Sequence, residues 1–395
     1  MLQAVAEENL HPRPAPASIL SGAGGQGDRF GPADRARGAR PAGNTRGGRV
    51  QFDRRGRIAG GARRAGVHGR TDAYYAISEE AKYSVEGETT GPCYSQAVGR
   101  SKGTLARKAG QREEAIRRAL DAVRANCDID ARRAADPVEF VHRYPALEDK
   151  EIVALVAASL AFGNVKALRA KIEEALKRLG PAIAALADDP ADVKARLKGW
   201  RHRVYRDSDL AGLIIGARKV QRAHGSLGAA LAAELQRAPD LRTALSAWVA
   251  RIRREGSLDH PGKPDGKSRG AAHILADPSK GSAVKRLMLL LRWMARPADG
   301  VDLGLWQVPT ERLLMPVDVH IHKLSRNLGF TDRADVSWKT AEEITAAMRR
   351  FDPADPVKYD FALCHMGMLQ ACPSKRDPAR CEGCGIIAVC RHWAR

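Results

Sequence analysis

The chain has no long apolar run, no recognisable export signal and few cysteines. Its longest apolar stretch, residues 152–162, is shorter than the roughly 18 to 20 residues that a membrane helix needs. The N-terminal residues lack the basic start and apolar core of a secretory signal. Seven cysteines in 395 residues do not suggest a disulfide scaffold. We therefore expect a cytoplasmic protein without membrane contact.

Acidic residues are scarce relative to basic ones. The chain carries 66 Lys and Arg against 46 Asp and Glu, a net charge of +20, and its pI is near 10.0. Residues 1–110 hold 18 of the basic and 10 of the acidic residues, so residues 111–395 keep a net charge of +12. A folded part this basic predicts binding to a polyanion, which for a soluble chain is usually nucleic acid.

Strand-like alternation is nearly absent. Residues 1–110 are rich in Gly, Arg, Ala and Pro without any regular apolar period, so we expect a disordered extension there. From residue 111 onward apolar residues recur at helical spacing, as in residues 148–162, and the Gly/Pro/Lys stretch 257–270 indicates a surface loop. The sequence predicts an all-α protein with two folded domains.

Four cysteines lie in one short C-terminal segment. They are Cys372, Cys381, Cys384 and Cys390, with the spacing C-x8-C-x2-C-x5-C. Four sulfurs this close suit one zinc ion or an iron–sulfur cluster. Zinc modules usually bring their ligands in two close pairs, and this segment has only one, so the spacing favours a [4Fe–4S] cluster. Zinc, with His392 as a competing ligand, and a disulfide pair are the alternatives.

A turn followed by a very apolar helix holds a candidate nucleophile. Residues 277–294 begin with Asp-Pro-Ser-Lys-Gly and continue as a helix whose apolar side chains cover most of its surface. Lys285 lies in the first turn, where burial and the positive end of the helix dipole both disfavour an ammonium ion. We expect a partly neutral lysine that can form a Schiff base. The alternative is a lysine that contacts a phosphate or solvent.

Residues 316–330 hold a candidate carboxylate. Pro316 ends the preceding element, Asp318 opens a helix, and Gly329 ends that helix. The dipole and the backbone N–H groups of a helix N-terminus keep a carboxylate ionised. Asp318 could therefore stabilise positive charge in a transition state, with a plain helix cap as the alternative.

Together these segments resemble endonuclease III-like DNA glycosylases of the helix-hairpin-helix superfamily. The cysteine spacing is that of their iron–sulfur loop, except that the first gap is two residues longer. Gly281 matches the first glycine of their hairpin, and Ala283 stands where the second usually lies. Lys285 falls where the bifunctional members carry their Schiff-base lysine. Asp318 falls on the essential aspartate, with His320 two positions later as in those enzymes. The resemblance spans about residues 136–390 and is closest to an uncharacterised bacterial branch labelled a domain of unknown function.

The resemblance implies base-excision repair. The expected reaction cleaves the N-glycosidic bond of a damaged or mismatched base in double-stranded DNA, with strand nicking by an AP-lyase step if Lys285 is the nucleophile. In such enzymes a side chain from the loop after an early apolar helix fills the gap left by the flipped base, here Phe162 or Asn164. We expect a nucleoid-associated monomer. The residues expected to contact DNA are Phe162, Asn164, Gly281, Ser282, Ala283, His320, Lys375, Arg376 and Arg380.

The same resemblance implies the domain arrangement. Residues 150–317 should form a helical barrel, and residues 111–149 should join residues 318–395 in a cluster domain, with Lys285 and Asp318 facing each other across a cleft. The chain departs from the family by inserting residues 297–315 between them, and Asp302 in this insert is a reserve carboxylate. The alternative functions are a non-catalytic protein that binds damaged DNA and a zinc-stabilised RNA-binding module.

Overall fold

The computed structural model describes residues 95–259 and 269–393, with side chains from residue 107 onward. The disorder predicted for residues 1–94 lies outside this part of the chain. Residues 95–110, for which we also expected no order, form the beginning of helix α1 (Ser95–Ala125) instead. Good helix formers make up more than half of this stretch and run directly into the Glu/Arg/Ala-rich residues that follow.

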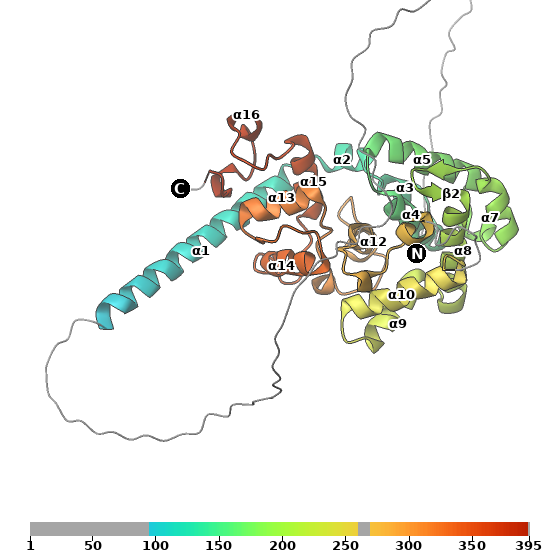
Figure 1. Cartoon of the computed structure of the whole chain (residues 1–395), viewed down its shortest axis with the longest axis horizontal. Coiled ribbons are helices and arrows are strands. Elements are labelled where there is room, and N and C mark those ends of the chain that lie inside the picture. The colour runs from blue at the N-terminus through green and yellow to red at the C-terminus, as the bar shows by residue number, and fades with distance from the viewer. Residues whose placement is uncertain (1–94, 260–268, 394–395) are drawn as a thin grey trace, which may run out of the picture. The chain divides into compact units, whose positions relative to one another are not determined.

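The described residues are mostly helical, as the sequence predicts (Figure 1). The first half contains α2 (Ile129–Ala135), α3 (Glu139–His142), α4 (Leu147–Leu160), α5 (Val165–Leu179), α6 (Ile183–Leu186), α7 (Pro190–Leu197), α8 (Asp207–His224), α9 (Leu227–Arg237) and α10 (Leu241–Glu255), with strands β1 (Arg201–His202) and β2 (Tyr205–Arg206) before α8. The second half contains α11 (Arg269–Ile274), η1 (Pro278–Lys280), α12 (Lys285–Ala295), η2 (Thr310–Arg312), α13 (Val319–Leu328), α14 (Trp338–Arg349), α15 (Asp360–Leu369), α16 (Pro378–Cys381) and η3 (Ile387–Val389).

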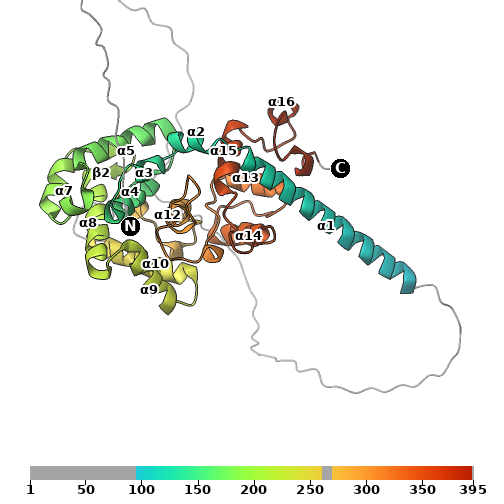
Figure 2. The same cartoon turned by 180° about the vertical axis from the view of Figure 1, so that it is seen from behind.

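Helix α4 is the centre of the core. It is apolar on nearly every side and packs against α3, α5, α6, α8 and α12, as expected for a helix without a polar face. Near the other end of the chain, α15 packs against both α1 and α13 (Figure 2). Helices α12 and α13, which carry the two candidate catalytic residues, are therefore each packed against a neighbouring helix, α4 and α15 respectively.

Short polar side chains begin many of the helices. Each accepts a hydrogen bond from a backbone N–H group of the first turn, which would otherwise lack a partner. These N-terminal caps are Asp128, Asn164, Asp189, Ser226, Asp240, Asp318, Ser337 and Asp377. The candidate carboxylate Asp318 is thus a cap, as the sequence predicts.

Residues 297–315, the insert expected from the resemblance, contribute several buried side chains to the core. Trp306 contacts Trp248 edge to face, with ring centroids 6.1 Å apart, and its Nε1 donates to the carboxylate of the fully buried Glu151 on α4 at 2.7 Å. The same carboxylate accepts the backbone N–H groups of Leu227 and Gly228 at 2.8 and 3.0 Å. A buried carboxylate needs such donors, so Glu151 joins the insert to α4 and α9.

Among the helices that the structure describes, none is both long and apolar enough to span a bilayer.

Candidate functional site

The fold brings the two predicted catalytic residues together. Lys285 is the first residue of α12, and Asp318 caps α13. The Lys285 Nζ atom lies 2.7 Å from Asp318 Oδ2, although the two residues are 33 positions apart in the chain. The side chains keep 29% and 16% of their surface exposed, so the ion pair is held by the fold and still reachable from solvent.

Four donors converge on the Asp318 carboxylate. Its Oδ1 accepts the backbone N–H groups of His320 and Ile321, both at 2.9 Å. Its Oδ2 accepts from Lys285 and, at 3.7 Å, from the thiol of Cys364 on α15. Both oxygens are therefore fixed in position, which preorganises the negative charge.

The pKa of Lys285 differs from the expectation based on the sequence. Burial alone would lower the pKa of Lys285, but the Asp318 carboxylate beside it outweighs burial and raises that pKa above its usual value. Burial likewise disfavours the charged form of Asp318, yet Lys285 and the backbone N–H of Ile321 lower its pKa. The resting state is an ammonium–carboxylate pair, so the prediction of a partly neutral lysine was wrong. The sequence alone does not show how close Lys285 lies to Asp318.

The reserve candidate Asp302 is not at this site. It is 1% exposed and pairs with Arg292 Nε at 3.1 Å and with the guanidinium of Arg296. Arg292 also binds the buried Asp360 on α15. Because both oxygens of Asp302 are used by arginines within the core, we assign it to the fold and not to chemistry.

Asp360 lies near the Lys285–Asp318 pair without a hydrogen bond to either residue. Burial raises its pKa to about 6, although the charges of Arg292 and Lys285 act in the opposite direction. The charge of Asp318 adds to the rise. The two carboxylates therefore interact electrostatically, and Asp318 is the one held ionised.

The predicted DNA-binding hairpin precedes α12. Gly281 adopts a left-handed conformation with φ of 88°, and its carbonyl accepts the N–H of Trp338 at 2.9 Å. Ser282 is exposed, whereas Ala283 is 2% exposed. The alanine in place of the second glycine thus points its methyl group into the core.

Phe162 is partly buried in an aromatic cluster. Its ring packs edge to face against His202, Tyr205 and His273, with centroids 5.0 to 5.9 Å apart. Asn164 is exposed and caps α5 through the N–H of Ala167 at 3.0 Å. To act as a wedge in DNA, Phe162 would have to move out of this cluster of rings. Asn164 would have to give up its hydrogen bond with the N–H of Ala167.

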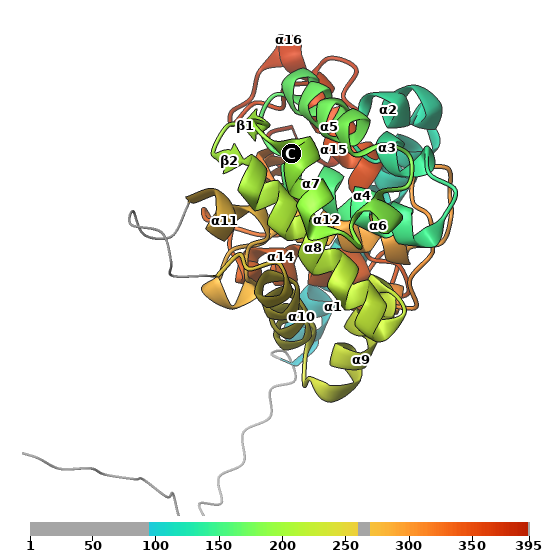
Figure 3. The same ribbon diagram turned by 90° about the vertical axis from the view of Figure 1, so that its right-hand side faces the viewer.

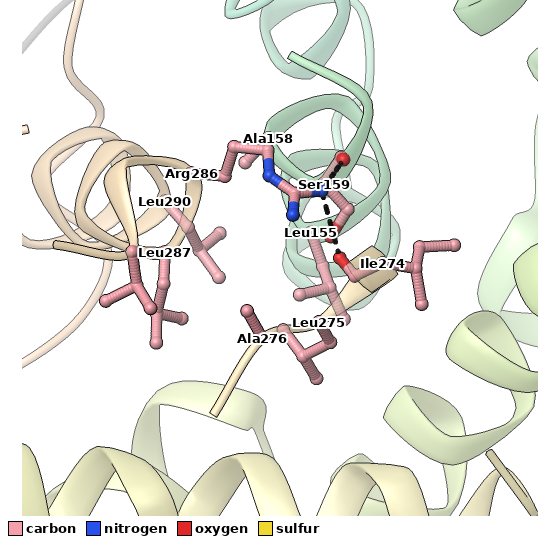
Figure 4. A pocket seen from close by; sticks show the side chains of 10 residues that line it. Leu155, Ala158, Ser159, Ile274, Leu275, Ala276, Arg286, Leu287 and Leu290 are labelled. Carbon is pink, nitrogen blue, oxygen red and sulfur yellow. Dashed lines mark hydrogen bonds between the residues drawn. The ribbon is translucent and has the colours of Figure 1, made fainter. Parts of the chain in front are cut away.

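Arg286 connects the aromatic cluster around Phe162 to α12. Figure 4 shows its guanidinium reaching from α12 to the carbonyl oxygens of Ser159 on α4 and Ile274 at the end of α11. It also binds the Tyr205 hydroxyl at 2.5 Å. Sequence reasoning missed Arg286, Tyr205 and Cys364, because each acts through a partner at least 46 residues away. For Cys364, the one available signal was its position in a helix leading to the cysteine segment.

His320 is half-buried on α13, at the contact with α15. A Cβ at Gly367 of α15 would lie 3.3 Å from the His320 Cβ and 3.0 Å from Leu324 Cδ1. Glycine at this position thus allows α13 and α15 to approach closely, and His320 lies where these helices meet.

The four C-terminal cysteines line one small cavity. Cys381 and Cys390 are buried, Cys372 and Cys384 are partly buried, and Asn327 Nδ2 lies 3.3 Å from Cys372 Sγ. His392, the competing zinc ligand considered above, also lines this cavity. The His392 Nε2 and Trp393 Nε1 atoms are buried without a hydrogen-bond partner in the described chain.

The side chains that line this cavity are of the chemical type that a sulfur-ligated metal centre requires. Four thiols and two unpartnered N–H-bearing rings face one space, and burial is the main cause that raises the pKa of Cys372, Cys384 and Cys390. Within residues 95–259 and 269–393, no three His, Cys, Asp or Glu side chains stand in metal-binding geometry. The [4Fe–4S] and zinc assignments therefore stay predictions.

The three basic residues of the cysteine loop are exposed. The Arg376 guanidinium lies 4.0 Å from the ring centroid of Trp393, and Arg380 Nε lies 3.5 Å from Asp377. Lys375 is exposed beside them. All three can reach a ligand in solvent.

Comparison with known proteins gives one result. No curated protein and no solved structure matches the chain significantly. The family described as "Protein of unknown function (DUF2400)" matches residues 136–369. This span is more than half of the chain; it contains Lys285, Asp318 and Cys364 and ends before Cys372. The chain therefore belongs to the DUF2400 family.

Proposed function

We propose that the protein is a base-excision repair DNA glycosylase with the helix-hairpin-helix glycosylase fold. The observation that carries the proposal is the contact of 2.7 Å between Lys285 and Asp318, which joins the starts of two helices at a partly exposed position. A fixed carboxylate beside an amine suits a reaction in which positive charge develops on a sugar. The substrate class is double-stranded DNA with a damaged or mismatched base.

In this mechanism Asp318 stabilises the oxocarbenium-like sugar as the base leaves with the electrons of the glycosidic bond. Because Asp318 already accepts four donors, little reorganisation is needed when the charge forms. A water molecule then attacks C1′, and its proton passes to the released base, which took the electrons of the broken bond. In the AP-lyase variant the Lys285 amine attacks C1′ instead. Its ammonium must first lose a proton, and Asp318 is the acceptor within hydrogen-bond distance.

We further propose a [4Fe–4S] cluster held by Cys372, Cys381, Cys384 and Cys390, with zinc as the alternative. Such a cluster would hold the C-terminal loop in place and supply no step of the base-removal reaction. Lys375, Arg376 and Arg380 would then contact DNA phosphates from the surface of this loop. Purified protein that contains iron and acid-labile sulfide in equal amounts would support the cluster, whereas zinc without sulfide would contradict it.

The test of catalysis is base release from a panel of duplexes, each with one defined lesion or mismatch. Asp318→Asn should reduce release by about 100- to 1,000-fold, because it removes the charge while the side chain can still cap α13. Asp240→Asn is the matched control, since Asp240 is also an aspartate cap, on α10. Equal rates for Asp318→Asn and wild type, or no release from any duplex, would refute the proposal.

The AP-lyase step has its own test. Borohydride should trap a covalent product between the protein and lesion-bearing DNA, and Lys285→Ala should abolish it. Lys280→Ala, an exposed lysine of the same hairpin, should trap like wild type. Base release without trapping would assign water as the nucleophile.

A second candidate function is a non-catalytic protein that binds damaged DNA. The observation in its favour is the raised pKa of Lys285, which disfavours the neutral amine that a nucleophile requires. This function predicts tighter binding to lesion-bearing than to intact duplex, without base release and without any effect of Asp318→Asn on the DNA product.

A further inference from the structure

Strands β1 and β2 form an arginine-rich hairpin, residues 201–206, which we call the arginine hairpin. They are antiparallel, with Arg201 opposite Arg206 and His202 opposite Tyr205. Successive side chains of a strand point to opposite faces, so one face carries His202 and Tyr205 and the other carries the two arginines. Figure 3 shows the hairpin beside α5, which contacts β1.

The inner face is fixed to the helix that begins with Lys285. His202 and Tyr205 are 7% and 1% exposed. The Tyr205 hydroxyl contacts His273 Nδ1 at 2.7 Å and accepts from the Arg286 guanidinium at 2.5 Å. Arg286 directly follows Lys285 in α12, so the hairpin has a rigid connection to the candidate catalytic pair.

The outer face has three exposed arginines. Arg201 and Arg206 lie directly opposite each other, and Arg203 lies at the tip. None of these three side chains has an acidic partner among the residues that the structure describes. The nearby carboxylates Asp207 and Asp209 accept backbone N–H groups, those of Gly199, Ser208 and Arg206. Like charges directly opposite each other destabilise a strand pair, so folding alone does not explain this arrangement.

The tip of the hairpin adjoins the loop that follows α4. The Arg203 guanidinium lies 4.8 Å from the ring centroid of Phe162. Gly163 has a φ of 91°, and a Cβ at this position would lie 2.4 Å from Arg203 Nη1. Arg203 therefore lies against both the ring and the backbone of the loop, and Val204 beside it is 45% exposed. The hairpin and residues 162–164 form one continuous surface.

We propose that the arginine hairpin binds the phosphodiester backbone of duplex DNA next to the Lys285–Asp318 pair. Guanidinium groups bind phosphates through two parallel hydrogen bonds, and three of them on one short element suit a partner that presents several phosphates in a row. Bound phosphates would also relieve the repulsion between Arg201 and Arg206. The inference rests on the proposed action on DNA, but it concerns binding and not chemistry.

The test measures binding of the full chain to an intact duplex by fluorescence anisotropy at several salt concentrations. In Arg201→Gln/Arg206→Gln the slope of log K against log salt should become smaller by about 1.8, since each lost phosphate contact removes about 0.9. Binding at 0.1 M salt should weaken by about 60-fold, which is the same slope change expressed as affinity. The melting temperature should equal or exceed that of wild type, because a like-charge pair is removed.

The matched control is Lys219→Gln/Arg237→Gln, which removes the same charge from exposed positions on α8 and α9 and should leave the slope unchanged. An equal loss in both double variants would overturn the inference, and so would wild-type protein that does not bind duplex. A loss of binding to phosphatidylglycerol vesicles without a loss of duplex binding would also overturn it, by assigning the surface to a membrane. If the slope changes as expected while no lesion releases a base, the hairpin inference stands and the glycosylase proposal fails.

Discussion

Both ends of α12 form ion pairs with aspartates, but the two sets of pairs differ in how much of them solvent can reach. Lys285 at its start and its partner Asp318 remain 29% and 16% exposed. Arg292 near its end and its partners Asp302 and Asp360 are at most 3% exposed. A sealed ion pair can act only on the fold, whereas an open pair can exchange a proton with, or bind, something from outside. This difference is the reason why we propose chemistry at the first turn of α12 and a purely structural role for its last turn.

The sealed end should dominate stability. Arg292→Met would leave the buried carboxyl groups of Asp302 and Asp360 without this guanidinium, and removing one partner of a buried pair typically costs about 3 to 5 kcal/mol. The free energy of unfolding from equilibrium denaturation measures this. Arg292→Met/Asp360→Leu should recover much of the loss, because two apolar side chains replace the pair. A single variant as stable as wild type would remove the distinction between the two ends.

The pH dependence of stability should reveal Asp360. Its pKa is about 6 in the fold, raised from 3.8, so its contribution to stability is fully present below pH 3.8 and is lost as the pH rises through 6. The stability of Asp360→Asn relative to wild type should therefore increase as the pH rises from 4 to 6, by on the order of 1 to 3 kcal/mol. The lowered pKa of Asp318 acts in the other direction, since its contribution is lost only as the pH falls below 3.8. Parallel curves for the two proteins would contradict this.

The open end should contribute little to stability. Lys285→Gln should lower the free energy of unfolding by less than about 1 kcal/mol, because the pair is partly solvated and Asp318 keeps its two backbone donors. The same denaturation experiment applies. A loss as large as that of Arg292→Met would assign Lys285 to the fold.

Substitution of Cys364 should have the smallest effect, a change in the pKa of Asp318. Its thiol donates to Asp318 Oδ2 at 3.7 Å, and a donor to a carboxylate lowers the pKa of that carboxylate. Cys364→Ala should raise the pKa of Asp318 and move the acid limb of the base-release profile upward by less than about one pH unit. Cys364→Ser should restore the wild-type profile, and Cys127→Ala, between α1 and α2, should not change it. An unchanged profile in Cys364→Ala would show that the thiol does not act on Asp318.

The sequence predicted local features better than spatial ones. Asp318 as a cap, Gly329 as the end of its helix and the helical content are confirmed, because each depends on a few neighbouring residues. The raised pKa of Lys285 and the burial of Asp302 were not predicted. Both depend on which groups approach from distant segments, and neither periodicity nor spacing records that distance. The arginine hairpin was missed because two-residue strands are too short to show alternation.

The hydrogen bond from Trp306 to Glu151 ties two distant positions of the chain to each other. Glu151 has no access to solvent and depends on indole, amide and backbone donors. Anyone who trims residues 297–315 to the length found in the glycosylases that the sequence resembles would take away the indole and leave one carboxylate oxygen with fewer donors. A shorter relative of this protein should therefore carry a different residue at position 151, and the two changes should be engineered as one.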